Sequence, residues 1–316
     1  MTSTDALTTE YRVLREGCGL LDRSERGKLA LTGTDAKGFL QGQVSNDVEG
    51  LTPGEGCYAT FLTPKGKMLG DLRVLDTGDE LLLDTERVSL QELFNMIRRF
   101  SIGYDVQLHK RTVESGLLSL AGPLADSMVK TEGLALAEHA HAAVSVAGIR
   151  ARAIRTDLGI DLLCDAADTE RLREAVCEAG ATPVSEAAAE IVRVEHGRPR
   201  YGVDLDDTVI PQEAGLNARA VSFTKGCYVG QETVARLHYR GKPNRHLRGL
   251  RLSHDASCGD QITLDGKVVG VLSTVARSPR LGPVGLALVR REAPPGSAVT
   301  VGSEAAAAEV VELPFS

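Results

Sequence analysis

The change in residue pattern at Gly241-Lys242-Pro243 constrains the fold of this chain more than any other feature of its sequence. Before this point, runs with the apolar period of strands alternate with runs that have the period of helices, which predicts an α+β fold. After it, residues 242–316 contain only short β-type runs separated by Gly, Asp and Pro, which predicts a small closed β-barrel. The five predicted barrel strands are 247–252, 261–264, 267–274, 283–289 and 298–301.

The region before residue 241 opens with a β-rich part. Three short alternating runs between residues 28 and 75 are separated by turns rich in Gly and Pro, and they predict strands. Ser89 stands three residues before Glu92, a capping-box spacing that predicts a helix beginning at Ser89. From about residue 116 to residue 194, strand and helix patterns alternate, which extends the α+β architecture.

The charge of the chain is unevenly distributed. The net charge is −7, but residues 219–251 hold eight Lys or Arg and only one acid, so this stretch carries +7 and the rest carries −14. The stretch is either a solvated basic face or a local well for an anionic ligand. Direct binding of nucleic acid is not expected, because the chain has no Trp and only six Phe and six Tyr to stack on bases.

The sequence predicts no secretion signal, membrane span, disulfide framework or metal site. The N-terminus lacks the basic and apolar regions of a secretion signal, and no apolar run is long enough for a membrane span, so we expect a cytoplasmic protein. The six cysteines stand far apart without zinc spacing, so we expect neither a disulfide framework nor a metal site. The histidines are scattered too, and the pair His139 and His141 is expected to be exposed.

Glycine-rich turns are concentrated in residues 39–71. The segments 39–47, 54–58 and 64–71 carry polar side chains among these glycines, above all Asn46 and Asp71. Glycine lets a backbone approach a ligand closely, and the polar side chains offer hydrogen bonds. The same residues are also ordinary turn formers, and spacing alone leaves both interpretations open.

A second segment, residues 193–204, follows a predicted helix with an apolar face. It contains Glu195, and a glutamate just past such a helix can face a cavity. One carboxylate accepts two parallel N–H bonds from a heterocycle such as a pterin. The alternative is that Glu195 pairs with Arg193 or Arg198.

A third segment, residues 223–232, places Cys227 two residues after Lys225 and between glycines. A nearby ammonium group lowers the pKa of a thiol and stabilises the thiolate. The alternative is a buried cysteine at a turn from a strand to a helix.

Taken in order, these segments resemble the YgfZ-type folate-binding proteins of the glycine-cleavage T-protein superfamily. The run Lys-Gly-Cys-Tyr-Val-Gly-Gln-Glu at 225–232 is similar to the signature of that family. The resemblance extends from about residue 21 to residue 301 and is weaker in 105–185. It also includes Phe-Leu-Gln-Gly-Gln-Val-Ser-Asn-Asp at 39–47, Pro-Lys-Gly-Lys-Met at 64–68, Arg-x-Glu-x-Gly at 193–197, Tyr-Gly-x-Asp at 201–204 and Pro-x-Glu-Ala-Gly-Leu at 211–216.

The resemblance implies an α+β, three-domain ring with a central folate channel and a C-terminal β-barrel. Residues 1–240 would form the folate-binding region from two interleaved subdomains, 21–105 with 200–240 and 106–199, and residues 242–316 the barrel. The implied ligand is tetrahydrofolate or a one-carbon-substituted form of it, in either the monoglutamylated or the polyglutamylated state. The implied role is support of iron–sulfur cluster assembly or repair and of cluster-dependent tRNA modification, by a monomer whose partners are iron–sulfur client or assembly proteins.

The resemblance also implies the residues of the site. Glu195 would bind the pterin, and Asp71 falls at the tandem-aspartate position of the T-proteins. Gly70 stands in place of the first aspartate, which reduces the stabilisation of a cationic iminium and disfavours the alternative activity, aminomethyl transfer from a lipoyl carrier to tetrahydrofolate. The candidate catalytic residues are Cys227, Lys225 and Asp71, and the candidate folate-binding residues are Asn46, Asp71, Glu195, Lys225, Gln231 and Arg236.

The third segment generates a prediction about Cys227. Cys227→Ala is expected to fold and to bind folate while the support of iron–sulfur enzymes in cells falls severely, and Lys225→Ala is expected to show a milder loss. The reason is that a thiolate beside a folate channel is a reactive group. Mass-spectrometric mapping at pH 7 checks the thiol itself: Cys227 is expected to be alkylated faster than the other five cysteines, and slow alkylation would leave its role structural.

Overall fold

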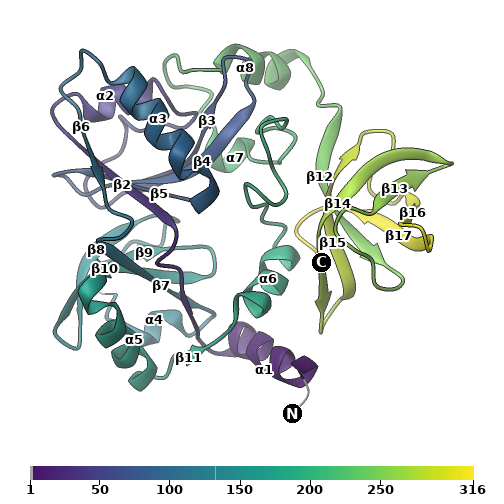
Figure 1. Ribbon diagram of the computed structural model, residues 1–316, viewed down its shortest axis with the longest axis horizontal. Coiled ribbons are helices and arrows are strands. Elements are labelled where there is room, and N and C mark those ends of the chain that lie inside the picture. Colours follow the sequence, from purple (N-terminus) through teal and green to yellow (C-terminus); the bar gives the residue numbers. More distant parts are fainter. Residues whose placement is uncertain (1–2, 132) are drawn as a thin grey trace.

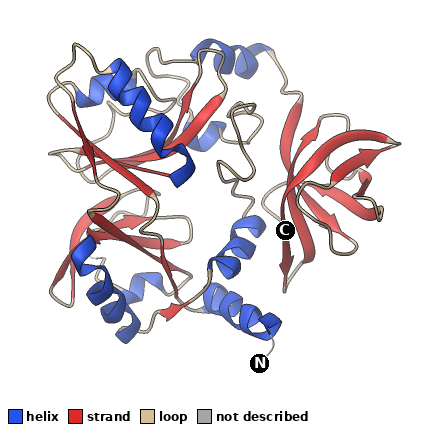
Figure 2. Ribbon diagram, viewed as in Figure 1, coloured by secondary structure: helices blue, strands red, loops and turns tan. Residues whose placement is uncertain are grey.

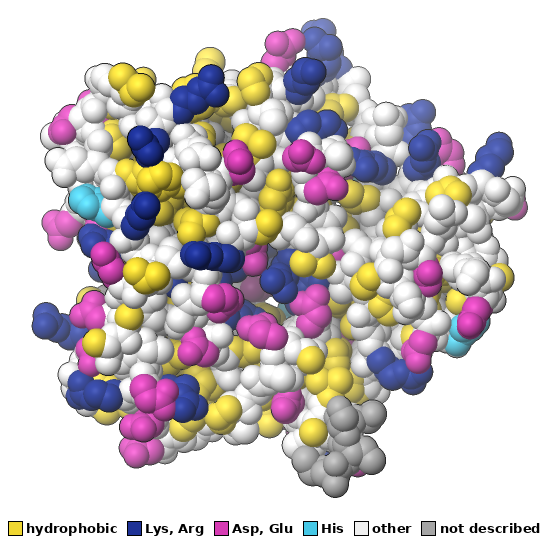
Figure 3. Space-filling model, viewed as in Figure 1, with side chains coloured by type: hydrophobic (Ala, Val, Ile, Leu, Met, Phe, Trp, Pro, Cys, Tyr) yellow, Lys and Arg dark blue, Asp and Glu magenta, His cyan; other side chains and the backbone are white. Residues whose placement is uncertain are grey.

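The computed structural model describes residues 3–131 and 133–316, and these form two β-sheet units and a closed β-barrel (Figures 1 and 2). The two sheet units lie one above the other, and the barrel lies beside them. The three units surround the middle of the molecule, where the space-filling view shows a hollow (Figure 3). The α+β fold with a C-terminal barrel is therefore confirmed. No helix within the described residues is long and apolar enough to cross a membrane.

The first sheet has five strands in the order β3-β4-β5-β2-β6. Helices α2 (Ala36–Gln41) and α3 (Leu90–Phe100) supply apolar side chains to its core, among them Phe39, Leu40, Leu93 and Ile97. The short helices α7 (Asn217–Ala220) and α8 (Gln231–Arg240) return to this unit late in the chain and pack on its edge. The strands are β2 (Gly27–Thr32), β3 (Gly56–Leu62), β4 (Met68–Asp76), β5 (Leu81–Thr85) and β6 (Gln107–Lys110).

The second sheet has six strands in the order β11-β1-β7-β10-β9-β8. Its core is aliphatic, and α5 (Thr169–Glu178) and the short α4 (Ala125–Met128) contribute to it. The strands are β1 (Gly19–Asp22), β7 (Ser115–Ala121), β8 (His141–Val146), β9 (Ile149–Arg155), β10 (Gly159–Asp165) and β11 (Thr182–Pro183).

Strand pairing places two boundaries elsewhere than expected. Strand β1 pairs with β7 and β11, so residues 19–22 belong to the second sheet rather than to the first. Strand β6 pairs with β2, so the first sheet runs to residue 110 rather than to residue 105. The helix predicted from Ser89 is confirmed, since Ser89 is the N-cap residue of α3, but the capping box does not form because the buried hydroxyl of Ser89 has no hydrogen-bond partner.

The barrel closes with six strands rather than the expected five, in the order β12-β15-β14-β13-β16-β17. The missed strand, β17 (Ala306–Val311), is rich in alanine, which is a poor strand former. Its burial nevertheless alternates, with Ala306, Ala308 and Val310 facing the core, and its pairing with β12 closes the barrel. The other strands are β12 (Arg245–Leu252), β13 (Gln261–Leu264), β14 (Lys267–Ser278), β15 (Gly282–Arg290) and β16 (Ala298–Val301).

A buried carboxylate, Asp204, attaches the barrel to the rest of the chain. One of its oxygens accepts hydrogen bonds from the hydroxyls of Ser273 (2.6 Å) and Thr274 (2.7 Å) on β14. The other accepts from Arg193 Nη1 (2.6 Å) on α6 (Glu186–Glu195) and from the backbone N–H of Arg200 (3.0 Å). The side chain of Asp204 has no exposed surface, and these four bonds satisfy it.

A second buried carboxylate, Glu195, lies at the end of α6 and reinforces the same junction. It accepts hydrogen bonds from the hydroxyl of Tyr11 (2.9 Å to Oε1) on α1 (Ser3–Glu16) and from Ser278 Oγ (2.5 Å) at the end of β14. Apolar side chains from α1, α6 and the barrel, including Leu14, Val192 and Phe315, form one core cluster around this contact.

The junction generates a prediction about stability. Asp204→Ala is expected to lower the free energy of unfolding by about 2–3 kcal/mol, because the hydroxyls of Ser273 and Thr274 lose their buried acceptor and Arg193 keeps only Glu190 as a carboxylate partner. Urea unfolding measures the change. Asp255→Ala is the matched control, since its pair with Arg277 is two-thirds exposed and such pairs contribute about 0–1 kcal/mol. Equal losses in the two variants would contradict the role of Asp204.

Candidate functional site

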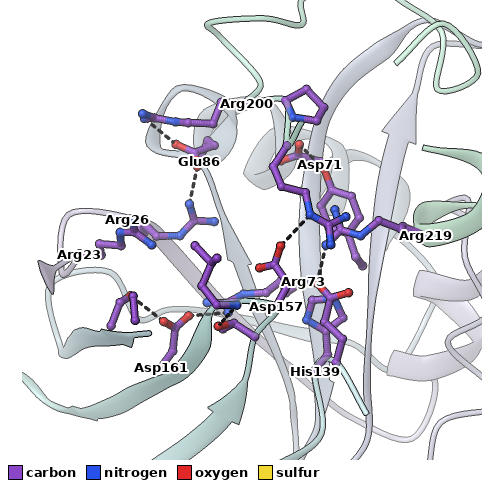
Figure 4. Close-up of a pocket in the computed structure, with 18 of the residues that line it drawn as sticks. Arg23, Arg26, Asp71, Arg73, Glu86, His139, Asp157, Asp161, Arg200 and Arg219 are labelled. Atoms are coloured by element: carbon purple, nitrogen blue, oxygen red, sulfur yellow. Dashed lines mark hydrogen bonds and ion pairs between the residues drawn. The ribbon is translucent and has the colours of Figure 1, made fainter. Parts of the chain in front are cut away.

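A cavity of about 200 Å³ lies between the two sheets and the segment that follows α6 (Figure 4). Six arginines and five carboxylates line it, from residues far apart in the sequence. Figure 4 shows Arg26, Glu86 and Arg200 along one side and Asp71, Arg219 and His139 along the other. A second cavity of about 420 Å³ adjoins it. The two share the lining residues Arg23, Ala121, Thr156, Asp157 and Leu158.

Ion pairs stabilise the wall of the cavity that lies between the two sheets. Arg73 on β4 donates to Asp84 (Nε, 2.6 Å) and to Asp161 (Nη1, 2.6 Å), and Asp161 belongs to β10 of the second sheet. Arg26 binds the same Asp84 through Nε (2.9 Å) and Nη2 (3.1 Å). Burial acts to raise the pKa of Asp84, but the guanidinium groups of Arg26 and Arg73 hold it at about 2. This wall is thus a rigid, permanently charged scaffold.

Asp71 differs from these paired carboxylates. It accepts a hydrogen bond from the hydroxyl of Tyr58 (2.7 Å), and the guanidinium of Arg219 lies 5.3 Å from the centre of the Tyr58 ring. Burial raises the pKa of Asp71 to about 6, although the bond from Tyr58 opposes the rise. A cavity carboxyl that titrates this close to neutrality can accept a hydrogen bond when ionised and donate one when protonated.

Three buried polar atoms of the cavity-lining side chains have no hydrogen-bond partner. They are Nδ1 of His139, Nε of Arg200 and Nε of Arg219. Unpartnered buried polar groups are costly, so they are uncommon away from sites where a ligand or water completes them. Together with Asp71, they offer donors and acceptors to a polar heterocycle.

Of the residues expected to bind folate, Asp71 lines the cavity and Glu195 does not. The side chain of Glu195 is 1% exposed, and the hydroxyls of Tyr11 and Ser278 already occupy its oxygens. In this structure the carboxylate closes the helix–barrel junction, and its contact with a pterin stays a prediction. The alternative pairings with Arg193 and Arg198 are not observed either, since these arginines bind Asp204 and Asp157.

The side chains of Asn46 and Lys225 donate hydrogen bonds to backbone carbonyls near the cavity. The amide of Asn46 donates to the carbonyls of Tyr58 (2.8 Å) and Arg219 (3.2 Å), two residues that line the cavity. Lys225 Nζ donates to three carbonyls, including those of Val44 (2.7 Å) and Asn46 (3.0 Å). Burial lowers the pKa of Lys225 to about 8. Both side chains thus hold the wall of the cavity in place and do not line it.

Three candidate residues do not line the cavity: Cys227 precedes α8, Gln231 begins it and Arg236 lies in its middle. Cys227 is exposed, but the ammonium of Lys225 is occupied by carbonyls, so the expected stabilisation of a Cys227 thiolate by Lys225 has no structural basis. The cysteine that Lys225 does influence is Cys57, whose pKa burial raises to about 12. Arg236 pairs with Glu232 (3.0 Å) on the surface of α8. Cys258 is the other exposed cysteine.

The basic stretch 219–251 does not form one well for an anion. Its members separate in the fold: Arg219 lines the cavity, Arg245 pairs with Glu213 and Arg248 pairs with Glu312. Lysine and arginine side chains do gather over α8 and the adjoining edge of the barrel (Figure 3). The basic residues of this stretch that are exposed are Arg236, Arg240 and Lys242.

Several cavity residues were missed in the sequence. His139 and His141 were expected to be exposed, but they are only 8% and 3% exposed. Tyr58 ends one of the glycine-rich segments, where it could have been singled out as the aromatic neighbour of a ligand. The arginines of the wall carry no local signal, because only the tertiary fold brings Arg26, Arg73 and Arg219 to one place.

Comparisons with known proteins agree with this architecture. Residues 1–225 match the family model of the GCVT N-terminal domain, and residues 245–316 match that of the glycine cleavage T-protein C-terminal barrel domain. An aminomethyltransferase of Geobacillus kaustophilus is 30% identical over 330 residues, which cover 98% of this chain and 90% of that protein. A putative chloroplastic transferase of Arabidopsis thaliana is 28% identical over 310 residues, 95% of this chain and 71% of that protein.

A solved structure shares the fold. The crystal structure of glycine cleavage system aminomethyltransferase T from Bartonella henselae aligns with a TM-score of 0.87 and 22% sequence identity, covering 98% of this chain and 89% of that one. The arrangement of sheets and barrel described above is therefore shared with that protein.

The state of Asp71 generates a prediction about pH. Its carboxyl has a pKa of about 6 in the folded chain against an ordinary value of 3.8, so stability that is present below pH 4 is lost as the pH rises through 6. The loss corresponds to roughly 3 kcal/mol. Asp71→Asn cannot ionise, so its stability relative to the native protein is expected to improve by that amount between pH 4 and pH 7 in urea unfolding.

A second variant for the same experiment changes Tyr58, whose hydroxyl donates a hydrogen bond to Asp71. Tyr58→Phe removes the hydrogen bond that favours the ionised form of Asp71, so the pH at which stability is lost is expected to rise. A stability difference between Asp71→Asn and the native protein that stays constant with pH would show that folding does not raise the pKa of Asp71.

Proposed function

The chain belongs to the glycine-cleavage T-protein family, and from this premise we propose that it binds tetrahydrofolate in the central cavity. The observation that supports this most is that Asp71 and the unpartnered atoms of His139, Arg200 and Arg219 belong to residues that line the same cavity. A pterin ring carries amino and N–H donors beside carbonyl and ring-nitrogen acceptors. Asp71 would accept from the donors, and the arginine N–H groups would donate to the acceptors.

The adjoining cavity suits the remainder of the ligand. It shares five lining residues with the first cavity and also contains Arg15 and Arg155. The Nε of Arg155 is buried without a partner. Folate ends in glutamate carboxylates, which guanidinium groups bind strongly. We place the tail there and not on the dispersed stretch 219–251.

We propose further that the chain is an accessory protein that supports iron–sulfur cluster assembly or repair and cluster-dependent tRNA modification. The resemblance of residues 225–232 to the YgfZ signature supports this role. Gly70 supports it as well, because a Cβ atom there would lie 2.6 Å from the Phe61 ring and 2.7 Å from Ser89 Cβ. No first aspartate of the tandem can stand in this packing, so electrostatic help for a cationic iminium is limited to Asp71.

Aminomethyl transfer is the second candidate function. The relative from Geobacillus kaustophilus carries the name aminomethyltransferase, and Asp71 retains the second position of the tandem. In this reading Asp71 alone would stabilise the developing positive charge. The two candidates share the folate site and differ in whether the bound folate receives a one-carbon unit.

Folate binding is tested by calorimetry with tetrahydrofolate and its 5-formyl form. Arg219→Gln is expected to weaken binding by about 2 kcal/mol, because it removes charge-assisted hydrogen bonds in a desolvated site. Arg236→Gln, a surface residue paired with Glu232, is the matched control and is expected to bind like the native protein. Absence of heat with any reduced folate at high micromolar protein would refute the proposal.

The choice between the two functions is tested by reconstituting glycine cleavage with purified partner proteins. The native chain is expected to transfer no aminomethyl group above background. Gly70→Asp, which restores the tandem in sequence, is expected to gain no activity and to lose several kcal/mol of stability through overpacking. Gly226→Asp, where nothing lies within 4 Å of the added Cβ, is the control for stability. Robust turnover by the native chain would favour the transferase.

A further inference from the structure

His139 combines three features that packing alone does not explain. The first is its backbone: φ is +70°, in the left-handed region that only a few per cent of residues other than Gly adopt, with Asn, Asp and His enriched among them. The conformation is held by the pairing of the adjacent chain, where the N–H of His139 donates to the carbonyl of Arg155 (2.9 Å) and the N–H of His141 donates to that of Gly54 (2.8 Å). Strain of this kind costs about 1–3 kcal/mol, and it is concentrated at functional sites.

The second feature is an unsatisfied ring. His139 is 92% buried, since only 8% of its surface is exposed, and Nδ1 has no hydrogen-bond partner. The other nitrogen, Nε2, lies 3.7 Å from the carboxylate of Glu138, which is too long for a hydrogen bond, and Glu138 is instead engaged by Arg219. Nδ1 therefore carries the desolvation cost of a buried polar atom that has no partner.

The third feature is position. His139 lines the central cavity, and its ring centre is 6.4 Å from that of Tyr58, whose hydroxyl binds Asp71. In Figure 4 His139 lies on the same side as Asp71 and Arg219. The ring therefore lies on the wall where the proposed ligand would present its polar edge.

We propose that His139 is a folate-binding residue, whose imidazole hydrogen-bonds the pterin ring and whose strained backbone holds it on the cavity wall. This inference rests on the proposed function and extends it by naming a recognition residue. Burial, with the nearby Arg73, lowers the pKa of His139 to about 4. The uncharged imidazole has one donor and one acceptor, so it can recognise either a carbonyl or an N–H group of a pterin.

The test uses two variants and a matched control. Asn tolerates a positive φ and Gly removes the strain entirely, so His139→Asn and His139→Gly both lose the imidazole without a backbone penalty. Ala147→Gly is the control, because Ala147 also has a positive φ (49°) but lies in the turn between β8 and β9, outside the cavity lining. Calorimetry with 5-formyltetrahydrofolate measures Kd, and thermal unfolding without ligand measures Tm.

Both His139 variants are expected to raise Kd at least tenfold while their Tm equals or exceeds that of the native protein. Ala147→Gly is expected to leave Kd unchanged. In native protein labelled with nitrogen-15 at histidine, the His139 resonances, assigned by their absence in His139→Asn, are expected to shift when the ligand is added.

Two results would overturn the inference while the native protein still binds the folate. One is a Kd within twofold of the native value in both His139 variants. The other is weaker binding accompanied by a Tm lowered by several degrees in both, since His139 would then only support the wall. Failure of the native protein to bind any reduced folate is a different result, which removes the proposed function and this inference with it.

Discussion

The carboxylate of Asp204 is the contact on which the arrangement of the molecule depends. It joins the end of α6, the segment after it and strand β14 through four hydrogen bonds, and it has no exposure to water. Moving the barrel would break these bonds and leave buried polar groups without partners. The bonds therefore hold the barrel in one position against the sheets. The segment that Asp204 fixes continues from the residues that line the cavity, Arg198 to Arg200. The shape of the site therefore depends on the attachment of the barrel.

Within this frame, the charges of the cavity divide into two sets. Arg26, Arg73 and Asp84 saturate one another and form a fixed wall between the sheets. Asp71, His139 and Arg219 keep either a pKa near neutrality or an atom without a partner. The first set provides rigidity, and the second provides the groups that a ligand completes. A preorganised site needs both, because binding energy is lost when the wall must reorganise around the ligand.

More of the fold than of the site could be predicted from the sequence. Strand and helix periods are local, so the α+β region and the barrel were recognised, while the alanine-rich β17 was missed because its alternation carries little hydrophobic contrast. Asp71 was identified through its motif. The contacts of Glu195 and Lys225 in this structure could not be predicted, because their partners, Tyr11 and the carbonyls around Val44, are far away in the sequence. His139 carries no motif, and its significance appears only in its backbone angle and its unpartnered nitrogen.

The central claim is that a reduced folate binds in the cavity between the two sheets. A crystal structure of the native protein grown with 5-formyltetrahydrofolate tests it most directly. The account predicts density for the pterin ring within hydrogen-bonding distance of Asp71, His139 and Arg219, with the glutamate directed towards Arg155. Density for the pterin at the surface of α8, or at Glu195 with Tyr11 displaced, would contradict it.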